Sequence, residues 1–228
     1  MKHRLAFIIH ILLIAAGAIG MIMVLDRGPR MLYYYTIDSN LLAIIGSVIY
    51  LAGEAAARRD LWGRRPQMPQ VFRYITLCCL MVTFIVVMTV LLPIYMMSGY
   101  GTAGMFSGWN LFFHVIAPLL SLFSFWFLED HEDLPGWSTF AAVIPTVIYA
   151  VVLIIMNIKG YVEGPYPFLM VRRQSAAASV LWCAAILAGN LLLALIIGAS
   201  ARALSRRARL RRLEREKEDL HELAEIDS

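Results

Sequence analysis

The stretch YITLCCLMVTFIVVMTVLLPIYMM, residues 74–97, decides the fold of this chain. It contains no charged residue, and it exceeds the roughly 20 apolar residues that an α-helix needs to cross the ~30 Å hydrocarbon core of a bilayer. A helix satisfies its backbone hydrogen bonds internally, which lipid requires. A strand of a membrane β-barrel would alternate apolar and polar residues, and this run does not. The stretch therefore predicts a membrane-spanning helix.

Five further apolar runs flank this one, and each predicts another membrane helix. The six runs are Leu5–Leu25, Tyr35–Ala56, Tyr74–Met97, Leu111–Leu128, Phe140–Ile158 and Ala178–Ser200. The composition agrees, because 60% of the residues are hydrophobic and only 16% are charged, against roughly 25% charged in ordinary soluble chains. The predicted fold class is all-α, a polytopic membrane protein with a six-transmembrane-helix bundle over residues 1–200.

Lys and Arg residues predict the orientation of the bundle, because cytoplasmic loops carry an excess of them. With the N-terminus inside, the inner segments hold fifteen of the 20 Lys and Arg residues. The outer segments hold Arg27, Arg30, Lys159, Arg172 and Arg173. We therefore expect both termini on the cytoplasmic side. Basic residues beside apolar runs also suit anionic lipid headgroups, whereas no soluble domain is present to carry a groove for nucleic acid.

The segment 201–228 is expected to be a charged, helical cytoplasmic tail that extends the sixth helix. Its leucines Leu210, Leu213, Leu220 and Leu223 recur at helical spacing. This spacing suits a helix that lies on the membrane, or one that pairs with a partner protein or a second copy of the chain. Two heptads or fewer do not define a coiled coil. A solvated charged tail explains the pattern equally well.

Polar residues inside the apolar runs are candidates for function, because they are costly to bury in lipid. Residues 33–40, at the start of the second run, read YYYTIDSN. One reading is a helix N-cap, since Thr, Asp, Ser and Asn satisfy free N–H groups at a helix start. A cap explains one such residue. It does not explain all four of Thr36, Asp38, Ser39 and Asn40, so this segment is a candidate site.

The fourth run contains a histidine at a predicted distortion of its helix. Pro118 lies four residues after His114 and has no N–H, so the carbonyl of His114 loses its helical partner and the helix is expected to kink there. A free carbonyl beside an imidazole would form a polar pocket in an apolar wall. The alternative is a structural histidine that bonds a neighbouring helix.

A third polar segment, residues 161–168, reads YVEGPYPF and contains Tyr166. Its two prolines and one glycine predict a stiff, non-helical lid on the outer side. Thr36 lies near the outer end of its run, and His114 lies roughly 5–10 Å below the outer surface at ~1.5 Å per residue. The three segments therefore converge on the outer half of the bundle, which predicts a site there.

A hydroxyl near an imidazole is the minimal pair for nucleophilic catalysis, because a base must take the hydroxyl proton. A neutral histidine buried in lipid suits the role of base. Asp38, Ser39 or Asn40 would orient the imidazole or donate to an oxyanion. A site open to the outer leaflet would admit lipid-like esters. The clustered ligands that a metal needs are missing, so neither a metal nor another cofactor is expected.

The segments YTIDSN (35–40), HVIAP (114–118) and YPF (166–168) resemble those of the androgen-induced protein family. That family includes the androgen-dependent regulator of tissue factor pathway inhibitor and many bacterial members. The resemblance covers helices two to six in order. It implies an atypical intramembrane hydrolase with a threonine nucleophile and a histidine partner, which in animals cleaves fatty acid esters of hydroxy fatty acids. Carried over, Thr36 is the nucleophile and His114 the base, in a bacterial cytoplasmic membrane.

Two residues outside these runs complete the predicted site, with Tyr166 in the lid and Arg172 near the outer end of the sixth run. Arg172 and Arg173 suit bidentate binding of a lipid carboxylate, although contacts to lipid headgroups are the simpler explanation. The competing function is a non-enzymatic lipid-binding, transport or scaffolding protein, in which Thr36 caps its helix and His114 bonds a neighbour. The hydrolase hypothesis instead requires both side chains to face one cavity.

Overall fold

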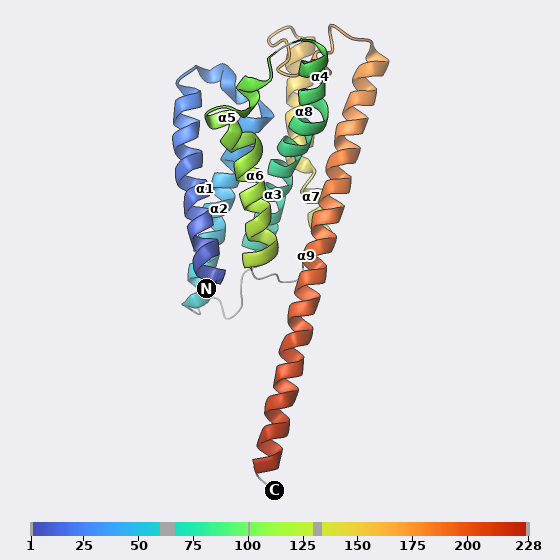
Figure 1. Cartoon of the computed structure of the whole chain (residues 1–228). Coiled ribbons are helices and arrows are strands. Elements are labelled where there is room, and N and C mark those ends of the chain that lie inside the picture. Colours follow the sequence, from blue (N-terminus) through green and yellow to red (C-terminus); the bar gives the residue numbers. More distant parts are fainter. Residues whose placement is uncertain (1, 60–66, 100, 130–133, 227–228) are drawn as a thin grey trace.

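A computed structural model describes residues 2–59, 67–99, 101–129 and 134–226, and in these ranges the chain is helical without any strand (Figure 1). Six helices are long and apolar enough to cross a membrane, which confirms the predicted all-α, multi-pass fold. These spans are Lys2–Val24, Tyr35–Arg58, Gln67–Met97, Trp109–Leu128, Ser138–Ile158 and Ala176–Glu218. Their orientation across the membrane, with both termini inside, stays a prediction.

Three of the six spans are single helices, and the other three contain short irregular turns. The elements are α1 (Lys2–Leu25), α2 (Tyr35–Arg58), α3 (Gln67–Val86), η2 (Val87–Leu91), α4 (Leu92–Met97), α5 (Trp109–Leu111), η4 (Phe112–Ile116), α6 (Ala117–Phe123), η5 (Ser124–Leu128), α7 (Ser138–Ala141), α8 (Ile144–Ile158) and α9 (Ala176–Ile226). Three 3-10 turns lie between spans: η1 (Pro29–Tyr33), η3 (Ala103–Phe106) and η6 (Pro167–Leu169).

Two spans extend well beyond their predicted apolar runs. The third span starts at Gln67 rather than Tyr74, and the proline in its first turn fits there because the first N–H groups of a helix have no helical partner. The sixth helix, α9, continues without a break to Ile226, so the charged tail extends that helix as expected. Figure 1 shows this extension, in orange to red, leaving the bundle on the side of the N-terminus.

The distortion expected at His114 takes the form of a π-helical turn. In η4 the N–H of Ala117 bonds the carbonyl of Phe112, five residues back. A similar turn, η2, comes just before Pro93, where the N–H of Leu92 bonds the carbonyl of Val87. A proline cannot supply the N–H that the regular ladder needs, and a π turn is a common adjustment near functional sites.

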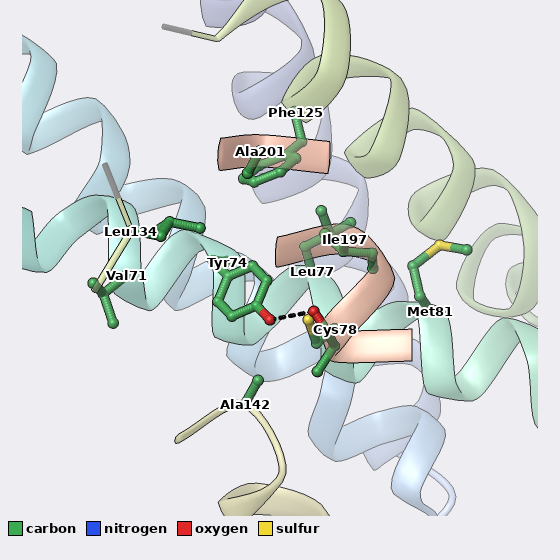
Figure 2. Packing of buried hydrophobic residues seen from close by; sticks show 11 residues of the cluster. Val71, Tyr74, Leu77, Cys78, Met81, Phe125, Leu134, Ala142, Ile197 and Ala201 are labelled. Atoms are coloured by element: carbon green, nitrogen blue, oxygen red, sulfur yellow. Dashed lines mark hydrogen bonds between the residues drawn. The ribbon is translucent and has the colours of Figure 1, made fainter. Parts of the chain in front are cut away.

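A packed cluster holds the long helix α9 against α3 and η5. Figure 2 shows Tyr74, Leu77 and Cys78 of α3 facing Ile197 and Ala201 of α9. The hydroxyl of Tyr74 donates to the backbone carbonyl of Ala194, at 2.5 Å. Small residues allow this close approach, as is usual between membrane helices, where packing rather than water exclusion drives association.

The fold places three connecting segments, 26–34, 101–108 and 159–175, at one end of the bundle, at the top of Figure 1. We call this the distal end, and the end that carries the N-terminus the proximal end. The distal end is the one that the distribution of Lys and Arg assigns to the outer side.

A buried ionic network lies near the proximal end and joins three spans. The Arg73 guanidinium donates to one carboxylate oxygen of Glu129, at 2.9 Å from Nη2, and to the hydroxyl of Ser121, at 2.9 Å. His10 Nε2 lies 3.2 Å from the same carboxylate oxygen. All four side chains are buried. From the sequence Arg73 was expected in an inner connecting segment, because hydropathy alone does not reveal a partner in another span.

Candidate active site

Thr36 lies in the first turn of α2, next to the point where the chain leaves its extended conformation at Tyr34. The carbonyl of Tyr34 accepts the N–H groups of Ile37 and Asp38, which starts the helix. Tyr34 itself is the N-cap residue, and it makes no side-chain capping bond. The structure therefore gives Thr36 no capping role. Its side chain is 7% exposed and faces a cavity.

That cavity, which we call the distal cavity, has a volume of about 280 Å³ and is lined by both Thr36 and His114. Its described walls come from the first four spans and from the distal loops. The lining residues are Val24, Arg27, Met31, Tyr34, Thr36, Ile37, Leu91, Tyr95, Gly104, Met105, Asn110, His114, Pro165 and Tyr166. Three of the residues predicted for the site, Thr36, His114 and Tyr166, are thus brought together.

A backbone carbonyl determines which nitrogen of His114 carries its proton. His114 Nδ1 lies 2.8 Å from the carbonyl oxygen of Met105 in η3. A carbonyl only accepts, so Nδ1 must be the donor. In the neutral ring, Nε2 then keeps a lone pair and can accept a proton. This is the tautomer that a general base needs, and the π turn of η4 holds the ring in this position.

Asn40 ties the turn that carries Thr36 to the turn that carries His114. Its side-chain nitrogen donates to the carbonyl of Thr36, at 2.8 Å, and to the carbonyl of Phe113, at 3.3 Å. In a π register the carbonyl five residues before Pro118 is that of Phe113, so the proline leaves it without a backbone donor. Asn40 supplies that donor and at the same time fixes the distance between α2 and η4.

Asn40 does not line the distal cavity, and neither do the other three residues predicted for the site. The hydroxyl of Ser39 bonds that of Thr83 in α3, at 2.7 Å. Asp38 is half-buried on another face of α2. Arg172 is exposed, and its guanidinium lies against Gly160 in the loop after α8. Their predicted roles in orienting or binding a substrate have no support from this arrangement.

Tyr166, in the loop after α8, packs against the start of α2. Its ring stacks on Phe168, with centroids 5.2 Å apart, and meets Tyr34 edge-on. Burial raises the pKa of the Tyr166 phenol to about 12, although its contacts with the hydroxyl and N–H of Thr36 and the N–H of Tyr35 oppose that rise. The phenol oxygen therefore lies where the first N–H groups of α2 point.

A second and mostly apolar cavity, which we call the apolar cavity, lies on the other side of Thr36. It has a volume of about 50 Å³. Its lining residues are Tyr35, Thr36, Val82, Thr83, Val86, Val87, Leu91, Thr146, Tyr149, Ala150, Tyr166, Phe168, Leu169, Trp182, Cys183, Ile186 and Leu187. Thr36, Leu91 and Tyr166 line both cavities, so these three residues form the boundary between them.

Several residues of the distal cavity were not predicted from the sequence. Arg27 is the charged side chain of its described lining, and Asn110 is an amide that donates to the carbonyl of Gly104, at 2.8 Å. Arg27 followed an apolar run and was counted only as an orientation signal. The described residues contain no group of three or more His, Cys, Asp or Glu side chains that could hold a metal ion.

No family model matches the chain, and neither the curated proteins nor the solved structures contain a match. The resemblance noted above therefore rests on the three short motifs alone. The chemistry and the substrate that the resemblance implies stay predictions.

Proposed function

We propose that the distal cavity hydrolyses a lipid ester, with Thr36 as the nucleophile and His114 as the general base. One observation carries this proposal. Thr36 and His114 come from different spans and line one cavity, while the Met105 carbonyl holds the proton on Nδ1 of the imidazole. A hydroxyl and a base with an available lone pair are the minimum that acyl transfer to a side chain requires.

The reaction would proceed in two steps. In the first, the Thr36 oxygen bonds to the ester carbonyl carbon as its proton moves to His114 Nε2, and the bond to the leaving oxygen then breaks as that oxygen takes the proton. The products are an alcohol and an acyl ester on Thr36. In the second, water attacks this ester, gives its proton to Nε2, and releases a carboxylic acid while Thr36 regains its proton.

Negative charge develops on the carbonyl oxygen in both steps and needs donors. The first N–H groups of α2, at Tyr35 and Thr36, point toward the phenol oxygen of Tyr166. The N-terminus of a helix favours negative charge, and oriented donors of this kind contribute strongly to acyl transfer. We assign the oxyanion to the phenol O–H of Tyr166, a donor whose oxygen accepts these N–H groups. Asn40 is engaged with two carbonyls and instead positions the two reacting turns.

The substrate class follows from the surroundings. The site lies among spans that are apolar enough to cross a membrane, with the apolar cavity on one side of Thr36 and Arg27 on the other. An ester with an apolar part and a polar or anionic end suits these surroundings. Fatty acid esters of hydroxy fatty acids, which the resemblance also implies, belong to this class.

One observation favours a second candidate, a lipid-binding protein without catalysis. Among the described residues no direct hydrogen bond joins the Thr36 hydroxyl to His114, so the pair is not closed in the free protein. Catalytic hydrogen bonds often form only when substrate is bound. The two functions therefore differ in turnover rather than in binding.

The test is hydrolysis of a branched fatty ester by the purified protein in detergent, with the released acid measured by mass spectrometry. Thr36→Ala and His114→Ala should both abolish turnover, and Thr36→Ser should retain part of it because a hydroxyl remains. The matched control is Thr89→Ala, because Thr89 is exposed and bonds only its own helix. Equal rates in Thr36→Ala and the parent protein would exclude this nucleophile.

A further inference from the structure

The long helix α9 packs on the bundle with one of its faces. Figure 2 shows Ile197 and Ala201 on this face, against α3. The buried residues of the face recur at intervals of three or four positions, as one face of a helix requires. They are Asn190, Ala194, Ile197, Ala201 and Ser205. Because α9 stands at the edge of the bundle (Figure 1), its other side is turned away from the bundle.

The exposed side of α9 carries a regular repeat, with members alternately four and three residues apart. We call these residues the outer stripe: Ala185, Gly189, Leu192, Ile196, Ala199, Ala203, Arg206, Leu210, Leu213 and Lys217, all of them exposed. At about 100° per residue, the outer stripe lies roughly half a turn from the face that packs on the bundle. It is longer than the three to four heptads that indicate a coiled coil.

The two leucines of the outer stripe that lie in the tail need a cover other than lipid. Lipid covers the apolar residues of the membrane part, so those residues alone do not indicate a partner. Leu210 and Leu213 lie beyond the apolar run and are 54% and 46% exposed. Because α9 is unbroken and continues straight out of the bundle in Figure 1, its tail points away from the bilayer instead of lying on it. A second helix beside the tail would bury both leucines, which is favourable.

A glycine in the membrane part of the outer stripe has no packing reason within its own chain. A Cβ added at Gly189 would meet no atom of the described chain within 4 Å. Glycine in the middle of a helix is less favourable than alanine. With Ala185 four residues before it, Gly189 has the spacing of small residues that lets two membrane helices approach closely.

Charges beside the outer stripe are complementary to those of a second copy. Two copies in one membrane extend their tails on the same side, so their α9 helices run parallel. In a parallel pair, residues flanking the stripe on one edge face residues five positions further on in the partner helix. Arg209 and Glu214 hold these two positions, and both are exposed. Two-fold symmetry repeats the contact, so the dimer gains two ion pairs of opposite charge.

The remaining charges are compatible with such a pair. Arg202 and Arg207 have the same five-residue relation and would repel, but Arg202 turns toward the bundle, beside the Tyr74 phenol. Arg206 follows the apolar run, where its long side chain can reach the lipid headgroups. A single lysine in the seam, here Lys217, is known to specify the register and the number of strands at a cost in stability.

We propose that the outer stripe of α9 binds the outer stripe of a second copy of this chain, which gives a parallel two-stranded dimer. The pairing starts in the membrane at the small residues Ala185 and Gly189 and continues into the tail at Leu210 and Leu213. The two bundles lie on opposite sides of the paired helices. This proposal does not depend on the proposed hydrolysis.

Disulfide crosslinking of the full chain tests the pairing. The background is Cys183→Ser, which leaves only the buried Cys78 and Cys79. Ala203→Cys places a thiol in the outer stripe, and Ala208→Cys, an identical change at an exposed position on the other side of the helix, is the matched control. In phosphatidylcholine vesicles with copper phenanthroline, Ala203→Cys should form linked dimers at least about tenfold faster, because a disulfide needs closely spaced backbones.

Charge reversal tests the recognition between copies. In the Ala203→Cys protein, Arg209→Glu and Glu214→Arg should each slow crosslinking about tenfold, because two exposed ion pairs become two like-charge contacts. The double variant restores both pairs and should recover the parent rate. Arg211→Glu removes the same charge away from the edge of the stripe, and it should leave the rate unchanged.

Three results would overturn the proposal. The first is equal crosslinking of Ala203→Cys and Ala208→Cys, which indicates random collision. The second is absence of linked dimers in phosphatidylcholine, or their formation only when phosphatidylglycerol is added, which would make the tail a lipid-binding segment. The third is failure of the double charge reversal to recover what the single reversals lose.

Discussion

The chain places a histidine near each end of its bundle, and the two are held in opposite ways. His10, near the proximal end, has no exposed surface, stacks on Tyr50 with centroids 4.4 Å apart, and faces Glu129. His114, near the distal end, is partly exposed and lines a cavity of about 280 Å³. One imidazole is fully enclosed, with Nε2 paired to Glu129 and Nδ1 buried without a hydrogen-bond partner among the described residues, and the other has open space beside it.

The surrounding charges differ as well. The carboxylate of Glu129 fixes the proximal ring, and Arg73 neutralises that carboxylate, so the group is a closed ion network. At the distal end a neutral carbonyl, that of Met105, fixes the ring and leaves Nε2 as an acceptor. A polar residue in a membrane span is therefore not by itself a site. The added signal is an available lone pair facing a volume that a substrate can enter.

The largest difference should appear when each histidine is replaced. His114→Ala should lower hydrolysis by about 10²–10⁴-fold, the usual contribution of a general base, with little change in melting temperature. His10→Ala should lower the melting temperature and leave the rate per folded molecule unchanged. Both are measured on monodisperse protein in one detergent. If folded His10→Ala protein lost activity, His10 would contribute to the reaction as well as to stability, and the contrast between the two histidines would be wrong.

Disrupting the ion network of Arg73 and Glu129 should lower the free energy of unfolding strongly. Glu129→Leu leaves the Arg73 guanidinium buried without its carboxylate, and breaking a buried pair in this way costs about 3–5 kcal/mol. Replacing both partners, as in Glu129→Leu with Arg73→Met, should recover part of the loss because no charge remains buried. The free energies of unfolding of the two single variants and the double variant form a cycle that measures the coupling. Additive losses would show that the two side chains act independently.

Acid should weaken the proximal end within a defined pH range. Burial alone would raise the pKa of Glu129, but Arg73 and His10 outweigh it and lower the pKa from 4.5 to about 2. A carboxyl group whose pKa is lower in the folded protein stabilises the fold at pH values above its usual pKa. This contribution is lost as the pH falls from about 4.5 toward 2. The melting temperature should decline across this range, and the decline should be smaller in Glu129→Gln. An equal decline in that variant would place the acid sensitivity elsewhere.

The smallest effect is expected at the mouth of the distal cavity. Arg27→Gln should raise KM by about threefold for an anionic ester, because an exposed ion pair contributes little in water. A neutral ester of the same chain should be unaffected. Arg30→Gln is the matched control, since Arg30 is an exposed cation of the same connecting segment that does not line the cavity. Equal changes for both esters would show that Arg27 acts on the fold rather than on charge.

Much of the fold could be predicted from hydropathy, because lipid allows few structures other than helices and length alone identifies a span. The start of the third span at Gln67 was missed because the charge of Arg73 interrupts the apolar run. Arg73 is tolerated inside the span because Glu129 and Ser121 bond it. That pairing joins residues far apart in the sequence, and no local pattern reveals it.

The site could be predicted at three residues, since topology alone brings Thr36, His114 and Tyr166 to one end of the bundle. Neighbours of Thr36 in the sequence were less predictable, because successive side chains turn by about 100° around a helix. Ser39 therefore faces α3, and Asn40, one turn below Thr36, bonds back to its carbonyl. Arg172 lies in a loop, where no periodicity indicates the direction of a side chain.

The central claim, that Thr36 carries the acyl group, can be tested by trapping that intermediate. The purified protein would be mixed with a p-nitrophenyl ester of a fatty acid, quenched in acid during the first turnover, and digested for peptide mass spectrometry. The account predicts the mass of the acyl group on Thr36, and its loss in Thr36→Ala. Turnover with no acylated peptide, or with the acyl group on another residue, would contradict it.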